Sequence, residues 1–150
     1  MEDKNSVIVY ETYIRTTAEQ LWMGLTDGEQ TAKWCYGSPI VSTWKVGDDY
    51  AYVTPDHSMT LIKGKVLEIE PRRRIVIDYQ MLYSPTLTED PPSREIWEIE
   101  DMGGICKLRV AHDQFGGETA TYHEVKRGIP WIYSSLKSLL ETGEPFPNQA

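Results

Sequence analysis

Three histidines are the residues of this chain best suited to acid-base chemistry or metal binding. His112 follows Leu108 and Val110 at even spacing, so it shares their face of a predicted strand and should point into the interior. There it could orient a ligand or act as an acid or base, or it could simply cap the end of the strand. His57 lies in a polar turn, and His123 lies off the apolar stripe of a predicted helix. We therefore single out His112.

Other chemical motifs are absent from the sequence. No histidine stands at metal-ligand spacing from a second histidine or a carboxylate, so we predict no metal and no cofactor. Cys35 and Cys106 are far apart and have no second pair, which favours reduced thiols. Cys35 could serve as a nucleophile with His112 only if the fold brings the two together. Without a Gly-x-Ser-x-Gly or phosphate-loop motif, we expect a binding protein rather than an enzyme.

Large aromatic and hydroxyl-bearing residues fall at positions that should face inward. They lie on the first predicted strand, on two later strands and on the last helix: Tyr10, Thr12, Tyr79, Trp97 and Tyr122. Pockets for small amphiphilic molecules combine aromatic walls with a few hydroxyl groups. The set therefore predicts a ligand cavity, whereas any one of these residues taken singly is better explained by ordinary core packing.

Size and charge limit the classes of partner. A chain of 150 residues, 40% of them hydrophobic, fits one domain over residues 1–150. The net charge of −8 and a pI of about 4.9 argue against nucleic acid and anionic membranes as partners. No apolar run approaches the roughly 18 residues of a membrane span. We expect a soluble, cytoplasmic protein, either a monomer or a homodimer.

The last helix, predicted over residues 119–143, organises the fold. Its apolar residues recur every three or four positions and form one stripe: Tyr122, Val125, Ile129, Ile132, Leu136 and Leu139. Thr121 and Glu124 have capping-box spacing, and Gly143 predicts a left-handed end. Pro130 should remove one hydrogen bond and kink the helix about one turn earlier.

The segments before this helix predict two short helices and seven strands. Helical spacing marks residues 17–26 and 29–35, and strands are predicted over residues 7–15, 41–44, 50–54, 59–70, 75–83, 93–100 and 105–112. We predict a bulge near Gly64 and a loop over residues 85–92. The class is α+β, in the order β-α-α-β-β-β-β-β-β-α: a curved antiparallel seven-stranded sheet around a long C-terminal helix. Sheet curvature should leave a gap beside the straighter helix, which is the natural binding site.

Several separated motifs resemble one known family. They include Gly128-Ile129-Pro130 with the helix that follows, and residues 17–22, 33–34, 64–69, 97–100 and 108–113. Together these motifs resemble the family named for the activator of the 90-kDa heat-shock protein ATPase. The resemblance implies the helix-grip fold of the wider SRPBCC superfamily, which includes START lipid-transfer domains, birch-pollen-allergen-like proteins and aromatase/cyclases.

The resemblance also implies candidate partners and residues. It places Trp34 beside the opening of the cavity, suggests an apolar, lipid or aromatic ligand, and links the family to the stress response. It further suggests a heat-shock chaperone as a partner, although the eukaryotic activator has two domains and this chain resembles the C-terminal one. The cyclase relatives suggest a third hypothesis, an enzyme of the cyclase or hydrolase type that uses His112. With Ile129 from the helical stripe, these residues complete the predicted ligand-cavity set.

Overall fold

The structure, a computed structural model, describes residues 6–147. In chain order its elements are β1 (Ile8–Ile14), α1 (Ala18–Thr26), α2 (Gly28–Trp34), β2 (Ile40–Ser42), β3 (Asp49–Val53), β4 (Thr60–Glu70), β5 (Arg74–Met81), α3 (Pro85–Thr88), β6 (Ser93–Asp101), β7 (Cys106–Asp113) and α4 (Ala120–Thr142). The predicted α+β order is confirmed. The one addition is α3, a single helical turn inside the predicted loop, which Ser84 caps by accepting a hydrogen bond from the Leu87 amide.

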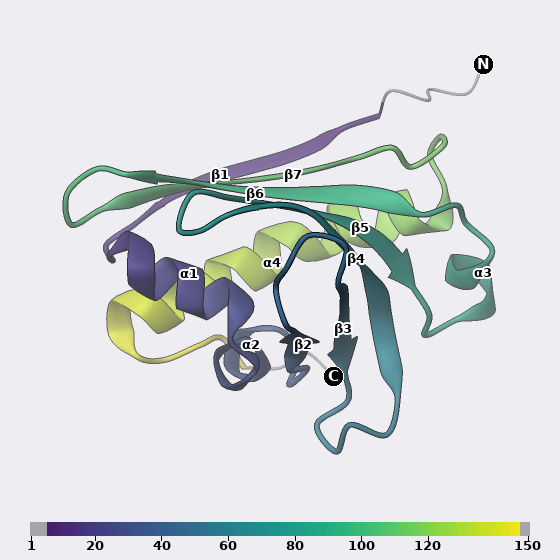
Figure 1. Cartoon of the computed structure of the whole chain (residues 1–150), viewed down its shortest axis with the longest axis horizontal. Coiled ribbons are helices and arrows are strands. Elements are labelled where there is room, and N and C mark those ends of the chain that lie inside the picture. Colours follow the sequence, from purple (N-terminus) through teal and green to yellow (C-terminus); the bar gives the residue numbers. More distant parts are fainter. Residues whose placement is uncertain (1–5, 148–150) are drawn as a thin grey trace.

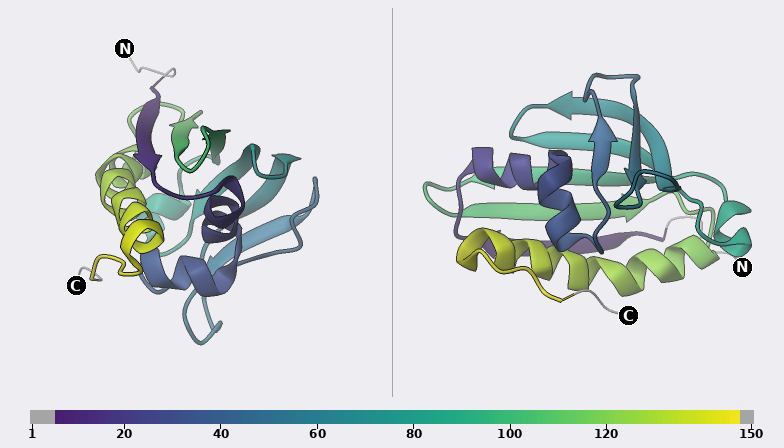
Figure 2. Two further views of the ribbon diagram at one scale, coloured as in Figure 1. Left: turned by 90° about the vertical axis from the view of Figure 1, so that its left-hand side faces the viewer. Right: turned by 90° about the horizontal axis from the view of Figure 1, so that it is seen from below.

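The seven strands form one antiparallel sheet in the order β1-β7-β6-β5-β4-β3-β2. Figure 1 shows α4 running along one face of this sheet, with α1 and α2 on the same side. The end-on view in Figure 2 shows the sheet curving around these helices. The arrangement is the predicted helix-grip fold. Within residues 6–147, no helix is both long and apolar enough to span a membrane.

The caps of α4 were predicted correctly at one end only. Gly143 ends the helix in the left-handed conformation at a φ of 84°. At the start, Thr119 is the N-cap and accepts a hydrogen bond from the Tyr122 amide, so the prediction of Thr121 was wrong. Thr121 is instead buried, and both its amide and its hydroxyl donate to Asp90. This contact joins the start of α4 to the loop that precedes β6.

The buried stripe of α4 differs from the predicted one by a small rotation. Val125, Ile129, Leu136 and Leu139 are buried as predicted, whereas Tyr122 and Ile132 are only partly covered. Tyr133 is almost fully buried and was not on the predicted stripe. Because Tyr133 follows Ile129 by four residues, it belongs to the same helical face. The helix therefore presents a phenol group, and not only aliphatic side chains, to the sheet.

The bulge in β4 lies three residues beyond its predicted position at Gly64. The pairing of β4 with β5 shifts between Val66 and Glu68, which leaves Leu67 as the extra residue. Gly64 has a different role: a Cβ atom at this position would lie 2.2 Å from the backbone oxygen of Asp78. Glycine is therefore required here so that two adjacent strands can approach closely.

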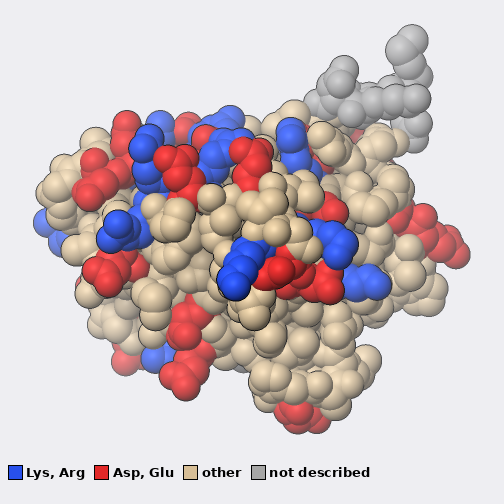
Figure 3. All heavy atoms as spheres, in the orientation of Figure 1, with Lys and Arg blue, Asp and Glu red and all other residues tan. Residues whose placement is uncertain are grey.

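The outer face of the sheet carries ion pairs. Glu98 pairs with Arg74 (2.6 Å) and with Arg109 (3.2 Å), and Lys107 pairs with Glu11 (2.9 Å). Figure 3 shows acidic and basic side chains interspersed on the face that it displays. Mixed surfaces of this kind give no broad region of one sign, and each exposed pair contributes little to stability.

Candidate functional site

The inner face of β6 carries an unusual set of polar groups. Ser93, Glu95 and Trp97 alternate along the strand, so their side chains point to the same side of the sheet, and all three are buried. In the ladder with β7, Glu95 stands directly opposite His112. Directly opposed residues have Cβ atoms only about 5 Å apart, so the register itself brings the carboxylate and the imidazole together.

Glu95 is the centre of a buried hydrogen-bond network. Its Oε1 accepts from Nδ1 of His112 at 3.1 Å, and its Oε2 accepts from Nε1 of Trp97 at 3.0 Å and from the Tyr133 hydroxyl at 3.1 Å. The indole nitrogen of Trp97 also lies 2.9 Å from the Tyr133 oxygen. A buried carboxylate is costly unless such donors surround it. Glu95 thereby joins β6, β7 and α4 at one point.

The ring of His112 is held on all sides. Its Nε2 lies 2.7 Å from the Ser93 hydroxyl. Ser93 and Glu95 therefore occupy both ring nitrogens of His112. Phe115 stacks on the ring at 4.7 Å, and Tyr79 meets it edge-on at the same centroid distance. The predicted inward direction of His112 is confirmed, and the side chain is fully buried.

Ser93, His112 and Glu95 have the order of a nucleophile, base and acid triad. The enzyme hypothesis lacked a partner for His112, and the structure supplies two. An attacking hydroxyl must, however, reach a substrate carbonyl at about 3 Å, and Ser93 is only 2% exposed. We therefore interpret the network as a polar anchor that fixes the sheet to α4 and orients the aromatic side chains around it.

Cys35 shows no sign of activation as a nucleophile. Burial, with a smaller contribution from the negative charge of Glu95, raises the pKa of its thiol to about 12. Both ring nitrogens of His112 are already bonded to Ser93 and Glu95, so neither is available to a thiol. A thiol with so high a pKa remains protonated and unreactive at neutral pH.

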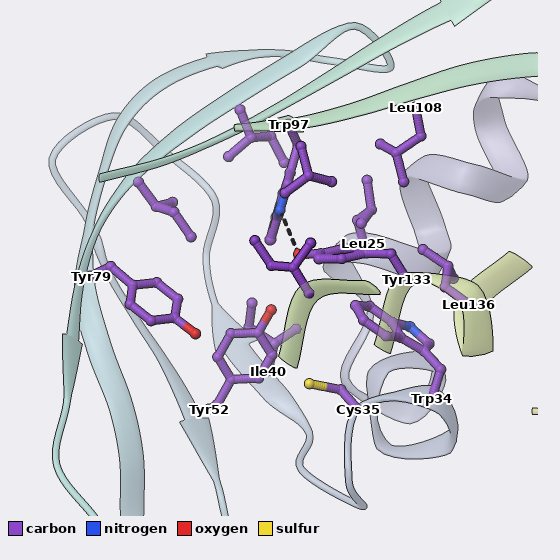
Figure 4. Packing of buried hydrophobic residues seen from close by; sticks show 14 of the residues in the cluster. Leu25, Trp34, Cys35, Ile40, Tyr52, Tyr79, Trp97, Leu108, Tyr133 and Leu136 are labelled. Carbon is purple, nitrogen blue, oxygen red and sulfur yellow. Dashed lines mark hydrogen bonds between the residues drawn. The ribbon is translucent and has the colours of Figure 1, made fainter. Parts of the chain in front are cut away.

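The structure brings most of the predicted cavity residues into one core cluster. Trp97, Tyr79, Ile129 and Trp34 are buried members, and Tyr10 and Tyr122 pack against them. Figure 4 shows Trp97 extending from the sheet toward Tyr133 on α4, and Tyr79 directed toward Tyr52 on the neighbouring part of the sheet. Thr12 is half-buried on the inner face of β1. That these residues bind a ligand stays a prediction.

Three of the predicted cavity residues, Trp34, Tyr10 and Tyr122, make specific contacts with neighbouring elements. Trp34 donates from Nε1 to the Gly24 carbonyl at 2.8 Å, and its ring lies 5.4 Å from that of Tyr133. The hydroxyl of Tyr10 lies 3.0 Å from the Ser134 Oγ on α4. Tyr122 reaches His112 indirectly, through Phe115. Trp34 thus ties α2 to α1 and packs on α4.

Metal ligands are not gathered anywhere in the described chain. Across residues 6–147, no group of three or more His, Cys, Asp or Glu side chains could hold a metal ion. His57 and His123 are exposed and separate from the network, as the sequence predicted.

The fold defines the class of protein. A curved antiparallel sheet that grips a long C-terminal helix is the helix-grip fold of SRPBCC-type proteins. Within that class, the family described as activator of Hsp90 ATPase homolog 1-like protein matches residues 15–141, so the chain belongs to this family. No curated protein sequence matches the chain significantly.

Solved structures share the fold at low sequence identity. The Aha1 dimer from Colwellia psychrerythraea is 17% identical, with a TM-score of 0.72 over 92% of this chain and 98% of that one. PFC0360w, an HSP90 activator from Plasmodium falciparum, is 17% identical, with a TM-score of 0.73 over 89% and 95%. CalU16 from Micromonospora echinospora is 19% identical, with a TM-score of 0.72 over 95% and 78%. At these identities the likeness shows the fold alone.

Proposed function

We propose that the protein binds a small apolar or aromatic molecule between the sheet and α4. One observation carries this proposal: the aromatic side chains of β5, β6, α2 and α4 converge on a buried polar network instead of an all-aliphatic core. Sites for small molecules combine apolar walls with a few fixed polar groups in this way. The family and its fold support a ligand-binding domain.

An NMR titration of the isotope-labelled protein tests this function. The probes are a panel of flat aromatic metabolites and fatty acids. We expect saturable shifts that cluster on Tyr10, Tyr79, Trp97, His112 and residues 122–132. Tyr79→Ala should weaken binding of any probe that binds, whereas Tyr13→Ala, an exposed tyrosine on β1, should leave it unchanged. Absence of saturable shifts across the panel would contradict the proposal.

A second candidate function is stimulation of a heat-shock chaperone ATPase. Family membership favours it, and the relative from P. falciparum is described as an HSP90 activator. The test is a steady-state ATPase assay of the chaperone with increasing amounts of this protein. No stimulation at saturating protein rejects this candidate. The Colwellia relative is a dimer, so light scattering of the purified protein should accompany the assay.

A further inference from the structure

Two buried tyrosines have hydroxyl groups without a hydrogen-bond partner. Tyr52 on β3 is 4% exposed and Tyr79 on β5 is 9% exposed, and neither hydroxyl bonds to any described residue. Their neighbours differ: the Tyr50 hydroxyl donates to the Asp78 carbonyl at 2.6 Å, and that of Tyr133 donates to Glu95. The missing bonds are therefore specific to these two positions.

The two hydroxyl groups are not sealed inside the protein. Among the described residues, every side-chain nitrogen or oxygen fully withdrawn from solvent has a partner. The unpartnered oxygens of Tyr52 and Tyr79 must therefore account for part of the small exposed area of these side chains. Each of these oxygens is therefore still accessible to at least a water molecule. An unpaired hydroxyl in such a place is a donor without an acceptor, and this is unfavourable unless water or a ligand completes the bond.

Both side chains face the same part of the interior. The same three titratable groups, Cys35, Glu95 and Tyr50, lie close enough to both side chains to act on the pKa of each. Figure 4 shows the Tyr79 hydroxyl directed toward Tyr52, with the Cys35 thiol beside the Tyr52 ring. The place lies between β3, β5 and the end of α2, next to the aromatic side chains of the candidate site.

The charges around this place favour a neutral ligand. Burial raises the pKa of both tyrosines well above the ordinary value, so the hydroxyl groups stay protonated and act as donors. At neutral pH Glu95 is the one ionised group among those that act on their pKa, and no lysine or arginine of the described residues is among them. His112 lies next to Tyr79, but both its nitrogens are already bonded. A bound carboxylate would therefore find donors but no free cation.

We propose that Tyr52 and Tyr79 form the polar end of the ligand site and donate hydrogen bonds to an acceptor oxygen, such as a ketone carbonyl, of a neutral aromatic molecule. The inference rests on the proposed binding function and specifies its ligand class. A neutral carbonyl oxygen has two lone pairs that can accept such bonds. The tryptophans and Tyr133 would then cover the apolar part of the molecule.

Three probes of nearly equal shape test the inference: 2-acetylnaphthalene, 2-isopropylnaphthalene and the 2-naphthoate anion. Affinities come from the NMR titration, with each probe added to the wild-type protein. We expect the ketone to bind at least about fivefold more tightly than the hydrocarbon, the gain of one or two net hydrogen bonds. The carboxylate should bind more weakly than the ketone.

Variants assign this preference to the two hydroxyl groups. The double variant Tyr52→Phe/Tyr79→Phe keeps both rings, so its ketone affinity should fall to that of the hydrocarbon while the hydrocarbon affinity stays unchanged. Tyr50→Phe is the control, because it removes a buried hydroxyl of the same strand that already has a partner. It should keep the ketone preference.

The outcomes separate this inference from the function on which it rests. If ketone and hydrocarbon bind equally well to the wild-type protein, the binding function holds and the hydroxyl recognition is wrong. Tighter binding of the carboxylate would overturn the preference for neutral ligands. If none of the three probes binds, the inference fails; the proposed function fails with it only if the rest of the panel also gives no saturable shifts.

Discussion

Replacing Glu95 by alanine should destabilise the protein more than any other removal of a single charged side chain on β6. The carboxylate accepts hydrogen bonds from His112, Trp97 and Tyr133. Truncation leaves the His112 and Tyr133 donors buried without this acceptor, whereas Trp97 keeps only the Tyr133 oxygen. Each unsatisfied buried donor costs about 1–3 kcal/mol. Since neighbouring effects are not additive, we expect a loss of about 3–5 kcal/mol in the free energy of unfolding.

The matched control is Glu98→Ala on the same strand. Glu98 makes two ion pairs on the outer face, but its side chain and those of its partners are partly exposed. Solvent screens such pairs, so this variant should lose less than about 1 kcal/mol. Urea unfolding followed by far-UV circular dichroism measures both, and an unchanged urea dependence would show that the two unfolded states are comparable.

Glu95→Gln tests the hydrogen-bond network without creating a cavity. The amide oxygen can still accept from Trp97 and Tyr133, but its NH2 group then faces Nδ1 of His112. His112 must change tautomer to accept, and Ser93 must turn its hydroxyl hydrogen toward the Tyr79 carbonyl, which lies 3.5 Å away. We expect a loss of about 1–2 kcal/mol, between the two alanine variants. If Glu95→Ala costs no more than Glu98→Ala, the network does not anchor the fold as argued.

Three further predictions concern stability. Tyr52→Phe and Tyr79→Phe should each leave the free energy of unfolding unchanged or slightly higher, because no hydrogen bond is lost. Tyr50→Phe should lower it by about 1 kcal/mol, because the bond to the Asp78 carbonyl is lost. Urea unfolding measures all three variants, and equal effects would contradict the prediction. In the folded protein the pKa of Cys35 is about 12, whereas an ordinary thiol has a pKa of 9.0. The free energy of unfolding should therefore fall as the pH rises above about 9. Cys35→Ala should remove the first part of this decline, and an identical pH profile for this variant would contradict the assignment. Gly64→Ala should prevent stable folding, because the added Cβ would clash with Asp78. Gly128 has open space around it on α4, so Gly128→Ala should stabilise the protein by about 0.5–1 kcal/mol. Melting temperatures that change in the same direction in the two variants would refute this contrast.

The arrangement of the elements was predictable because its signals are local. Alternation in β5 buries Ile75, Ile77, Tyr79 and Met81 on one side, as the pattern indicated. The start of α1 is likewise marked by adjacent residues, since Thr17 accepts a hydrogen bond from the amide of Gln20, three residues further on. Such features depend on a few adjacent residues. The N-cap of α4 and the bulge in β4 were less predictable because several neighbouring residues could serve.

The Glu95 network was missed because it depends on strand register. The alternation with Trp97 places Ser93 and Glu95 on the inward face of β6. Serine and glutamate are usually exposed, however, so their residue types argued against this placement. A signal did exist: Gly103 and Gly104 both have positive φ and form a tight turn between β6 and β7. If these two glycines form the turn, the residues of β6 and β7 pair outward from it, and this register places Glu95 opposite His112. Tyr133 was missed because Ile132, its more apolar neighbour, fits a helical stripe almost as well.

The unpartnered hydroxyls of Tyr52 and Tyr79 could not be predicted. Sequence periodicity places both rings inside, but whether a phenol oxygen finds an acceptor depends on atoms contributed by other strands and helices. Tyr50 and Tyr52 are two residues apart on one face of β3, yet only Tyr50 has a partner.

The pairing of β1 with β7 has a consequence for the order of events during synthesis. Ile8 lies opposite His112, so the first strand must wait for 112 − 8 = 104 further residues before its partner exists. At about 5–20 residues per second, this delay is roughly 5–20 seconds. During that time the strand is free to pair wrongly, and the sheet lacks one of its edges. The last steps of assembly are therefore the arrival of β1 and α4, which come from opposite ends of the chain and meet through Tyr10 and Ser134.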